Sequence, residues 1–187
     1  MPAIRSTRPN LNEQLPVALA ARVAGTDRAS LAHLIDHGLV PGLDIDSVRA
    51  LAASGEVTAK ATDDPGFLVA RLDIDPMARR ITDMSESQLE QALEGPHRIP
   101  GSYLGRELLV AVRSFVIATG RIDALADLVA LRTDRRGREI YARTITVRLE
   151  RRLTDLTSRP PKADGDSRWL GRRARMGTGG AVLALES

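Results

Sequence analysis

The segment 15–38 constrains the fold most, because it carries the start and stop signals of two short helices in quick succession. Pro16 suits the first turn of a helix, where its missing N–H is not needed, and Gly25 stands where a C-terminal cap is expected. Asp27 can cap a second helix through its side chain. The apolar stripe of that second helix consists of Leu31, Leu34 and Ile35. Only residues 25–27 link the two helices, so they must cross at a steep angle, as in a helix-turn-helix unit.

A helix-turn-helix unit predicts binding to double-stranded DNA, with the N-terminal residues of the second helix foremost in the major groove. The candidate contacts on and before that helix are Thr26, Asp27, Arg28, Ser30, His33 and His37. Arg28 is the best candidate for a bidentate contact to guanine, and His33 is the next. A helical hairpin inside an ordinary all-α protein has the same spacing, and this alternative stays open.

The next residues carry a resemblance to a known group. The run LAARVAGTDRASLAHLIDHGLVPG is followed by DIDSVRALAASG, in which Asp44 or Asp46 can cap a third short helix. Over residues 15–55 this pattern resembles the MerR and phage-excisionase group of winged-helix DNA-binding domains. That group has a basic, aromatic wing before its third helix, whereas only Gly42 and Leu43 stand there in this chain. The resemblance therefore implies the positions of the recognition helix and no wing contacts.

Composition sets the outer limits. Apolar residues make up 43% of the 187 residues but aromatic ones only 3%, so the core must consist of Leu, Val, Ile and Ala. With long runs at helical spacing, this composition predicts a mostly α fold. The chain has no cysteine, which excludes disulfides, zinc-thiolate sites and thiol catalysis. No run approaches the roughly 18 apolar residues of a membrane span, and no signal peptide is evident, so we expect a cytoplasmic protein without a membrane partner.

Five parts can be distinguished along the chain. They are a flexible arm (1–14), the helix-turn-helix domain (15–56), a connecting β-hairpin (57–80), a helical domain (81–157) and a basic tail (158–187). The hairpin is expected because a turn signal, DDPG, separates two runs with β character, 57–61 and 67–74.

The helical domain is expected to contain four helices. They cover residues 83–93 with Asp83 or Ser85 as the cap, 102–120, 123–131 and 137–157. In the last one, apolar side chains recur about every four residues and arginines lie opposite them. The β-branched residues within 140–147 keep a strand alternative open. Whether 121–157 forms a second DNA-binding unit also stays open.

Positive charge is concentrated in the second half of the chain. Residues 101–187 contain 17 basic and 10 acidic residues, and many of the arginines fall between 132 and 152. The candidate phosphate contacts among them are Arg135, Arg136, Arg138, Arg143 and Arg148. The alternative is a solvated helix face, for which Glu139 and Glu150 supply local partners.

Signals for catalysis or cofactors are weak. His33 and His37 are four residues apart on one helix, but no third metal ligand is evident near them. No nucleophile stands beside a base. We therefore expect no enzyme activity, no metal and no cofactor.

These patterns together predict a sequence-specific DNA-binding protein. By analogy it is a phage or mobile-element transcriptional regulator, such as a repressor, or an excisionase-like accessory factor. Residues 102–157 are expected to form a dimer contact or to grip flanking phosphates. Two alternatives remain, namely a phage DNA-packaging or virion assembly protein and an antitoxin-like protein-binding module.

Overall fold

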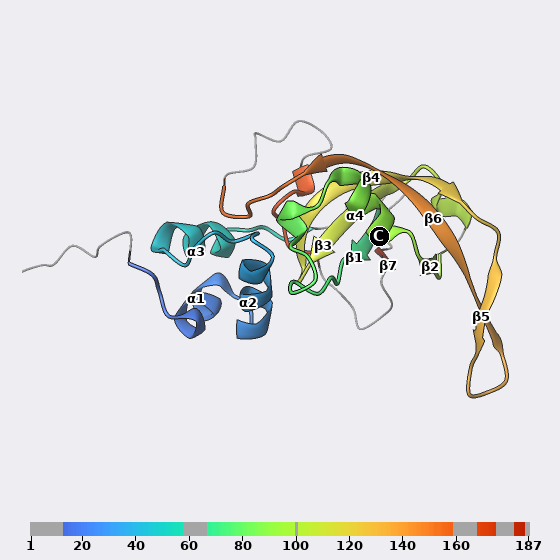
Figure 1. Ribbon diagram of the computed structural model, residues 1–187, viewed down its shortest axis with the longest axis horizontal. Helices are drawn as coiled ribbons and strands as arrows, with labels where there is room; N and C mark the ends of the chain where they lie inside the picture. Colours follow the sequence, from blue (N-terminus) through green and yellow to red (C-terminus); the bar gives the residue numbers. More distant parts are fainter. Residues whose placement is uncertain (1–12, 58–66, 100, 159–167, 175–181, 186–187) are drawn as a thin grey trace, which may run out of the picture.

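A helical N-terminal unit and a mixed β-sheet make up the protein (Figure 1). The computed structural model describes residues 13–57, 67–99, 101–158, 168–174 and 182–185. The expectation of a mostly α fold is wrong, because most of 102–157 forms strands. Most of the expected arm, the turn of the expected hairpin and much of the expected tail lie outside the described residues.

The three helices expected at the N-terminus are confirmed, as α1 (Val17–Ala24), α2 (Arg28–Asp36) and α3 (Ile45–Ala52). Their caps are those that the sequence predicts. Gly25 ends α1 in the left-handed conformation, at φ 66°, which costs glycine little. Asp44 begins α3 by accepting the backbone N–H groups of Asp46 and Ser47. The buried residues of α1 are all alanines, so the neighbouring helices approach it closely.

The sheet has the strand order β2-β6-β4-β3-β1-β7, and β5 pairs with β6 outside this path. The strands are β1 (Phe67–Arg71), β2 (Pro96–His97), β3 (Glu107–Val112), β4 (Phe115–Leu125), β5 (Val129–Thr133), β6 (Glu139–Arg152) and β7 (Val182–Leu185). Only the β1–β3 pair is parallel. The expected run 67–74 contains β1, which β3 and β7 flank on both sides, whereas the other run of the expected hairpin, 57–61, lies almost entirely outside the described residues.

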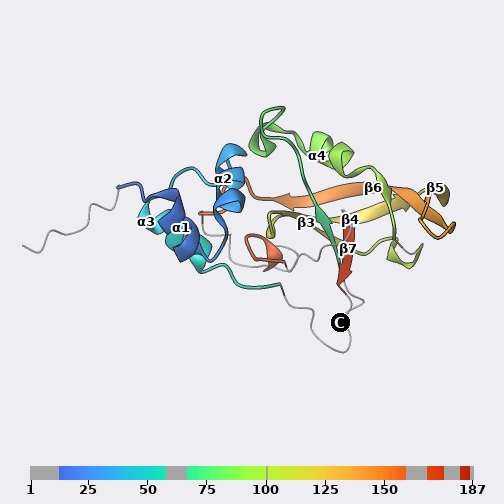
Figure 2. The same ribbon diagram turned by 90° about the horizontal axis from the view of Figure 1, so that it is seen from below.

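The connection from β1 to β3 crosses one face of the sheet. It contains a 3₁₀ turn η1 (Ile81–Asp83), the helix α4 (Glu86–Leu93), β2 and a second 3₁₀ turn η2 (Gly101–Tyr103). The expectation of a helix capped at Ser85 is confirmed, and Gln88 completes a capping box. Figure 2 shows α4 above the sheet, where it buries Leu89 and Leu93 in the main core.

Residues 102–120 form β3 and β4 instead of a helix, because their apolar side chains occur at odd and even positions alike. Leu108 and Val110 face the main core, whereas Leu109 and Ala111 face a second core on the opposite side of the sheet. A strand buried on both faces has a continuous apolar run, which periodicity alone does not distinguish from a helix. Gly120, expected as a helix end, lies within β4 where a Cβ would come 2.2 Å from the carbonyl oxygen of Arg148.

The expected helix 137–157 is also wrong, and the strand alternative for 140–147 is confirmed. Apolar residues four apart share a strand face as readily as a helix face, since four is a multiple of two. Ile145 and Leu149 thus face the main core from β6. Because β4, β5 and β6 occupy 121–157, this segment is not a second helical DNA-binding unit.

The described part of the expected tail packs against the sheet. Residues 168–174 cover the second core, with Trp169 only 6% exposed, and β7 pairs with β1. The main core is continuous from the three N-terminal helices to the sheet. No helix in the described part of the chain has the length and apolar character that crossing a membrane requires.

Candidate nucleic-acid interface

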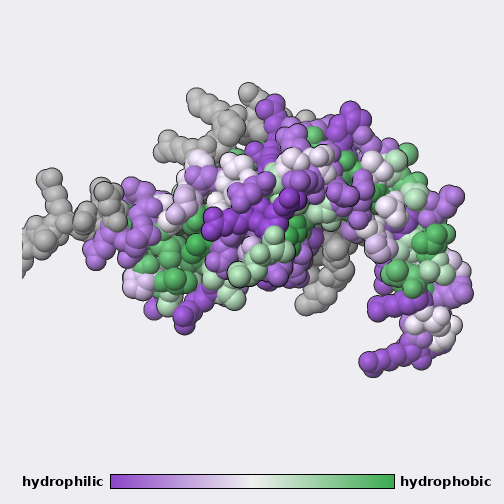
Figure 3. All heavy atoms as spheres, viewed as in Figure 1, coloured by the Kyte–Doolittle hydropathy of each residue, from purple (hydrophilic) through white to green (hydrophobic). Residues whose placement is uncertain are grey.

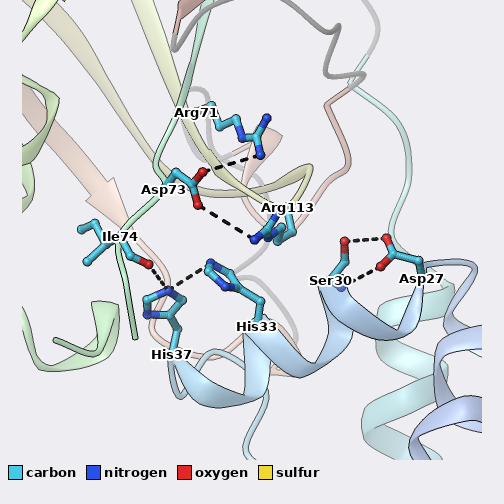
Figure 4. Close-up of polar contacts among 8 residues, drawn as sticks. All are labelled: Asp27, Ser30, His33, His37, Arg71, Asp73, Ile74 and Arg113. Atoms are coloured by element: carbon cyan, nitrogen blue, oxygen red, sulfur yellow. Dashed lines mark hydrogen bonds and ion pairs between the residues drawn. The ribbon is translucent and has the colours of Figure 1, made fainter. Parts of the chain in front are cut away.

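The turn between α1 and α2 presents the start of α2 to solvent. Asp27 is the N-cap of α2: its carboxylate accepts the backbone N–H of Ser30 at 2.8 Å and the Ser30 hydroxyl at 2.6 Å (Figure 4). The hydroxyl and then the backbone hydrogen bond lower the pKa of Asp27. Both side chains are therefore occupied in holding the helix end, which leaves Thr26, half-buried, and Arg28 as neighbours of the turn.

Arg28 is the first residue of α2 and is exposed. Among the described residues it has no ion pair or hydrogen-bond partner for its guanidinium. An arginine in this position can present two parallel N–H donors to a planar acceptor such as the edge of guanine. The structure thus leaves the best sequence candidate exposed at the N-terminal end of α2.

His33 and His37 point in the other direction, from α2 toward the sheet (Figure 4). His37 is fully buried: its Nδ1 accepts the backbone N–H of Ile81 at 3.3 Å, and its Nε2 lies 3.0 Å from the carbonyl oxygen of Ile74. The Nε2 atoms of the two histidines are 3.1 Å apart. His37 was expected to contact DNA but is buried, and His33 is half-buried beside it.

This contact requires a neutral His37. Because Nδ1 accepts a hydrogen bond from the backbone N–H of Ile81, the ring hydrogen is on Nε2, which donates to the Ile74 carbonyl oxygen. Burial, as the main cause, lowers the pKa of both histidines. The nearby charge of Arg113 lowers the pKa of His33 further.

Charged groups of the sheet surround the histidine pair. Asp73 lies 3.7 Å from Arg71 and 3.9 Å from Arg113, measured between carboxylate oxygen and guanidinium nitrogen. Arg113 and Ser114 form the tight β3–β4 turn with positive φ values of 46° and 71°. Within the described part of the chain, no three His, Cys, Asp or Glu side chains are grouped so that they could hold a metal ion.

The five candidate phosphate contacts do not form one stripe. Arg135, Arg136 and Arg138 lie in the turn between β5 and β6, and this turn forms the free end of the hairpin in Figure 1. Arg143 is half-buried on β6, opposite His97 of β2. Arg148 also lies on β6, and its Nε and a terminal nitrogen contact Asp123 of β4 at 2.8 and 2.6 Å. Arg148 thus forms an ion pair between two strands of the sheet.

Sequence reasoning missed the structural role of Arg173, which fell in the expected tail. Its guanidinium donates to the carbonyl oxygens of Ala24, of Gly25 at 2.8 Å and of Leu51 at 3.0 Å. It thereby caps the C-terminal ends of α1 and α3. Since the contact spans well over a hundred residues of sequence, no local pattern predicts it.

The exposed apolar residues of the β5–β6 hairpin were likewise not expected to lie at the surface. They are Leu128, Val129, Leu131 and Tyr141, each about half exposed. They fall within the expected helices 123–131 and 137–157. Comparisons of the chain with protein-family models, with curated proteins and with solved structures find no match.

Proposed function

We propose that this protein binds double-stranded DNA in a sequence-specific manner and acts as a transcriptional regulator, such as a repressor. The observation that carries the proposal is the exposed Arg28, for whose guanidinium the described residues supply no partner, at the start of a capped helix that follows α1 after a three-residue turn. The N-terminal end of α2 also carries the positive end of the helix dipole, which favours the phosphates of a duplex.

The contacts of α2 limit how the helix reads DNA. Its C-terminal end is held by His37 against the residues that follow β1, and His33 faces the same way. Base contacts therefore come from the first turn, with Arg28 as the specifying residue and the backbone around Thr26 near phosphate. Asp27 and Ser30 keep this turn in shape.

Selection of binding sites from a pool of random duplexes tests the proposal. The purified protein is expected to enrich one motif over several rounds. Enrichment of no motif above the input pool would overturn sequence-specific binding, whatever the affinity for DNA in general.

A second candidate, the virion assembly protein, is favoured by one observation. The β5–β6 hairpin exposes apolar side chains, and β5 is an edge strand whose five residues are all exposed. Such an edge can pair with another subunit. The molar mass in solution separates the two candidates, since a ring of many copies favours assembly and a monomer or dimer favours the regulator.

A further inference from the structure

The β5–β6 hairpin, residues 128–141, extends beyond the rest of the sheet (Figures 1 and 3). We refer to this hairpin as the arm, which is distinct from the flexible N-terminal arm expected at 1–14. Among the strands of the described segments, β5 pairs with β6 alone. All five residues of β5 are exposed, so no layer formed by the described residues covers this strand. A paired ribbon of this kind can reach a surface that the body of the protein does not touch.

The turn at the end of the arm is fixed by Asp134. Its carboxylate accepts the backbone N–H groups of Arg136 at 2.8 Å and Arg138 at 2.9 Å, and the Nε of Arg138 at 3.0 Å. Gly137 occupies the left-handed position at φ 76° that closes a three-residue hairpin loop. The hydrogen bond from the Arg138 backbone is the main cause that lowers the pKa of Asp134.

These contacts leave a concentrated positive charge. Residues 132–138 contain four arginines and a single acid, Asp134, which is already bound within the turn. Arg135 and Arg136 are exposed at the loop, and the described residues offer their guanidinium groups no acidic partner. The surface thus matches a polyanion in charge, and the loop is narrow enough to point long side chains into a confined groove.

We propose that the arm is a second DNA contact, in which Arg135 and Arg136 enter the minor groove of the duplex beside the site read by α2. This inference rests on the proposed function. The minor groove, about 6 Å wide, is too narrow for a ribbon but admits arginine side chains, and its negative potential attracts them. In both views the arm lies at one end of the long axis, and α2 lies in the helical unit toward the other end, so their contacts fall on separate stretches of DNA (Figures 1 and 2).

The test compares the full-length protein with the double variant Arg135→Ala/Arg136→Ala on one selected duplex with long flanks. The matched control is Arg79→Ala/Arg80→Ala, which removes two adjacent exposed arginines from the turn after β1. The arm variant is expected to flatten the plot of log affinity against log salt by about 0.9 for each lost contact, and the control to leave it unchanged. Netropsin, a minor-groove ligand, is expected to weaken binding of the wild type but not of the arm variant.

Each outcome has a definite meaning. A wild type that binds no duplex overturns the proposed function and this inference with it. A wild type that binds, together with an arm variant of unchanged slope and unchanged netropsin response, overturns the inference alone. A lower molar mass of the arm variant, with an unchanged slope, also overturns it, because the arm would then contact a second copy of the chain.

Discussion

At the residue scale, Arg173 joins the N-terminal helical unit to the sheet. Its guanidinium caps α1 and α3 and lies 5.0 Å from the centre of the Phe115 ring on β4. Its backbone also bonds to Gly55 and Val57, directly after the helical unit. A cation at two helix C-termini satisfies carbonyl groups that have no partner within the helices and complements the helix dipoles.

Replacing this side chain is expected to destabilise the whole molecule. Arg173→Ala removes hydrogen bonds to three carbonyl oxygens, each strengthened by the charge of the donor. We expect the free energy of unfolding in urea to fall by about 2–3 kcal/mol. Arg172→Ala is the control, because the exposed neighbouring guanidinium lies 5.9 Å from the Trp169 ring and its loss is expected to cost less than about 1 kcal/mol. Equal losses in the two variants would contradict the capping role.

At the element scale, the docking of α2 on the sheet depends on two histidines. His37 is neutral in this contact, and its pKa is lowered mainly by burial. The charges that act on it are Asp36 on its own helix, Asp73 after β1 and Arg113 in the β3–β4 turn, with His33 in direct contact. The two acids favour the protonated form, but burial prevails.

This lowered pKa gives stability a definite dependence on pH. Above the ordinary histidine value of 6.5 both the folded and the unfolded protein carry a neutral His37, so its contribution is fully present. As the pH falls below 6.5, the unfolded chain takes up a proton that the folded protein resists, and stability is lost. Urea unfolding between pH 8 and pH 5 is expected to show this loss in the wild type and a smaller loss in His37→Gln. Parallel curves for the two proteins would contradict the account.

Elements with chemical start and stop signals could be predicted from the sequence, whereas strands β3 to β5 and the pairing of the sheet could not. Gly25, Asp27, Asp44 and Ser85 each fix a helix end through their own side chain or backbone, so α1 to α4 follow from local chemistry. The sheet instead depends on contacts between distant segments, such as β1 with β3 and β7. Its buried strands have apolar residues at odd and even positions alike, so the alternation of apolar and polar residues that is typical of a strand is absent.

At the scale of the whole molecule, the candidate site was predicted in part. The first turn of α2 lies where the sequence analysis put it, with Arg28 exposed. Burial of His37 could not be foreseen, because it depends on where the residues after β1 cross α2. The arginines were seen as one stripe, but a β-hairpin carries three of them to its end and leaves Arg143 and Arg148 in the sheet.

The proposed function requires α2 to read DNA through Arg28. The most direct measurement is the affinity of the wild type, of Arg28→Ala and of the control Arg22→Ala for the selected duplex and for duplexes with each base pair changed in turn. We predict that the wild type and Arg22→Ala prefer a G·C pair at one position by about 1–3 kcal/mol, and that Arg28→Ala loses this preference there and nowhere else. An Arg28→Ala variant that folds and keeps every base preference of the wild type would contradict the account.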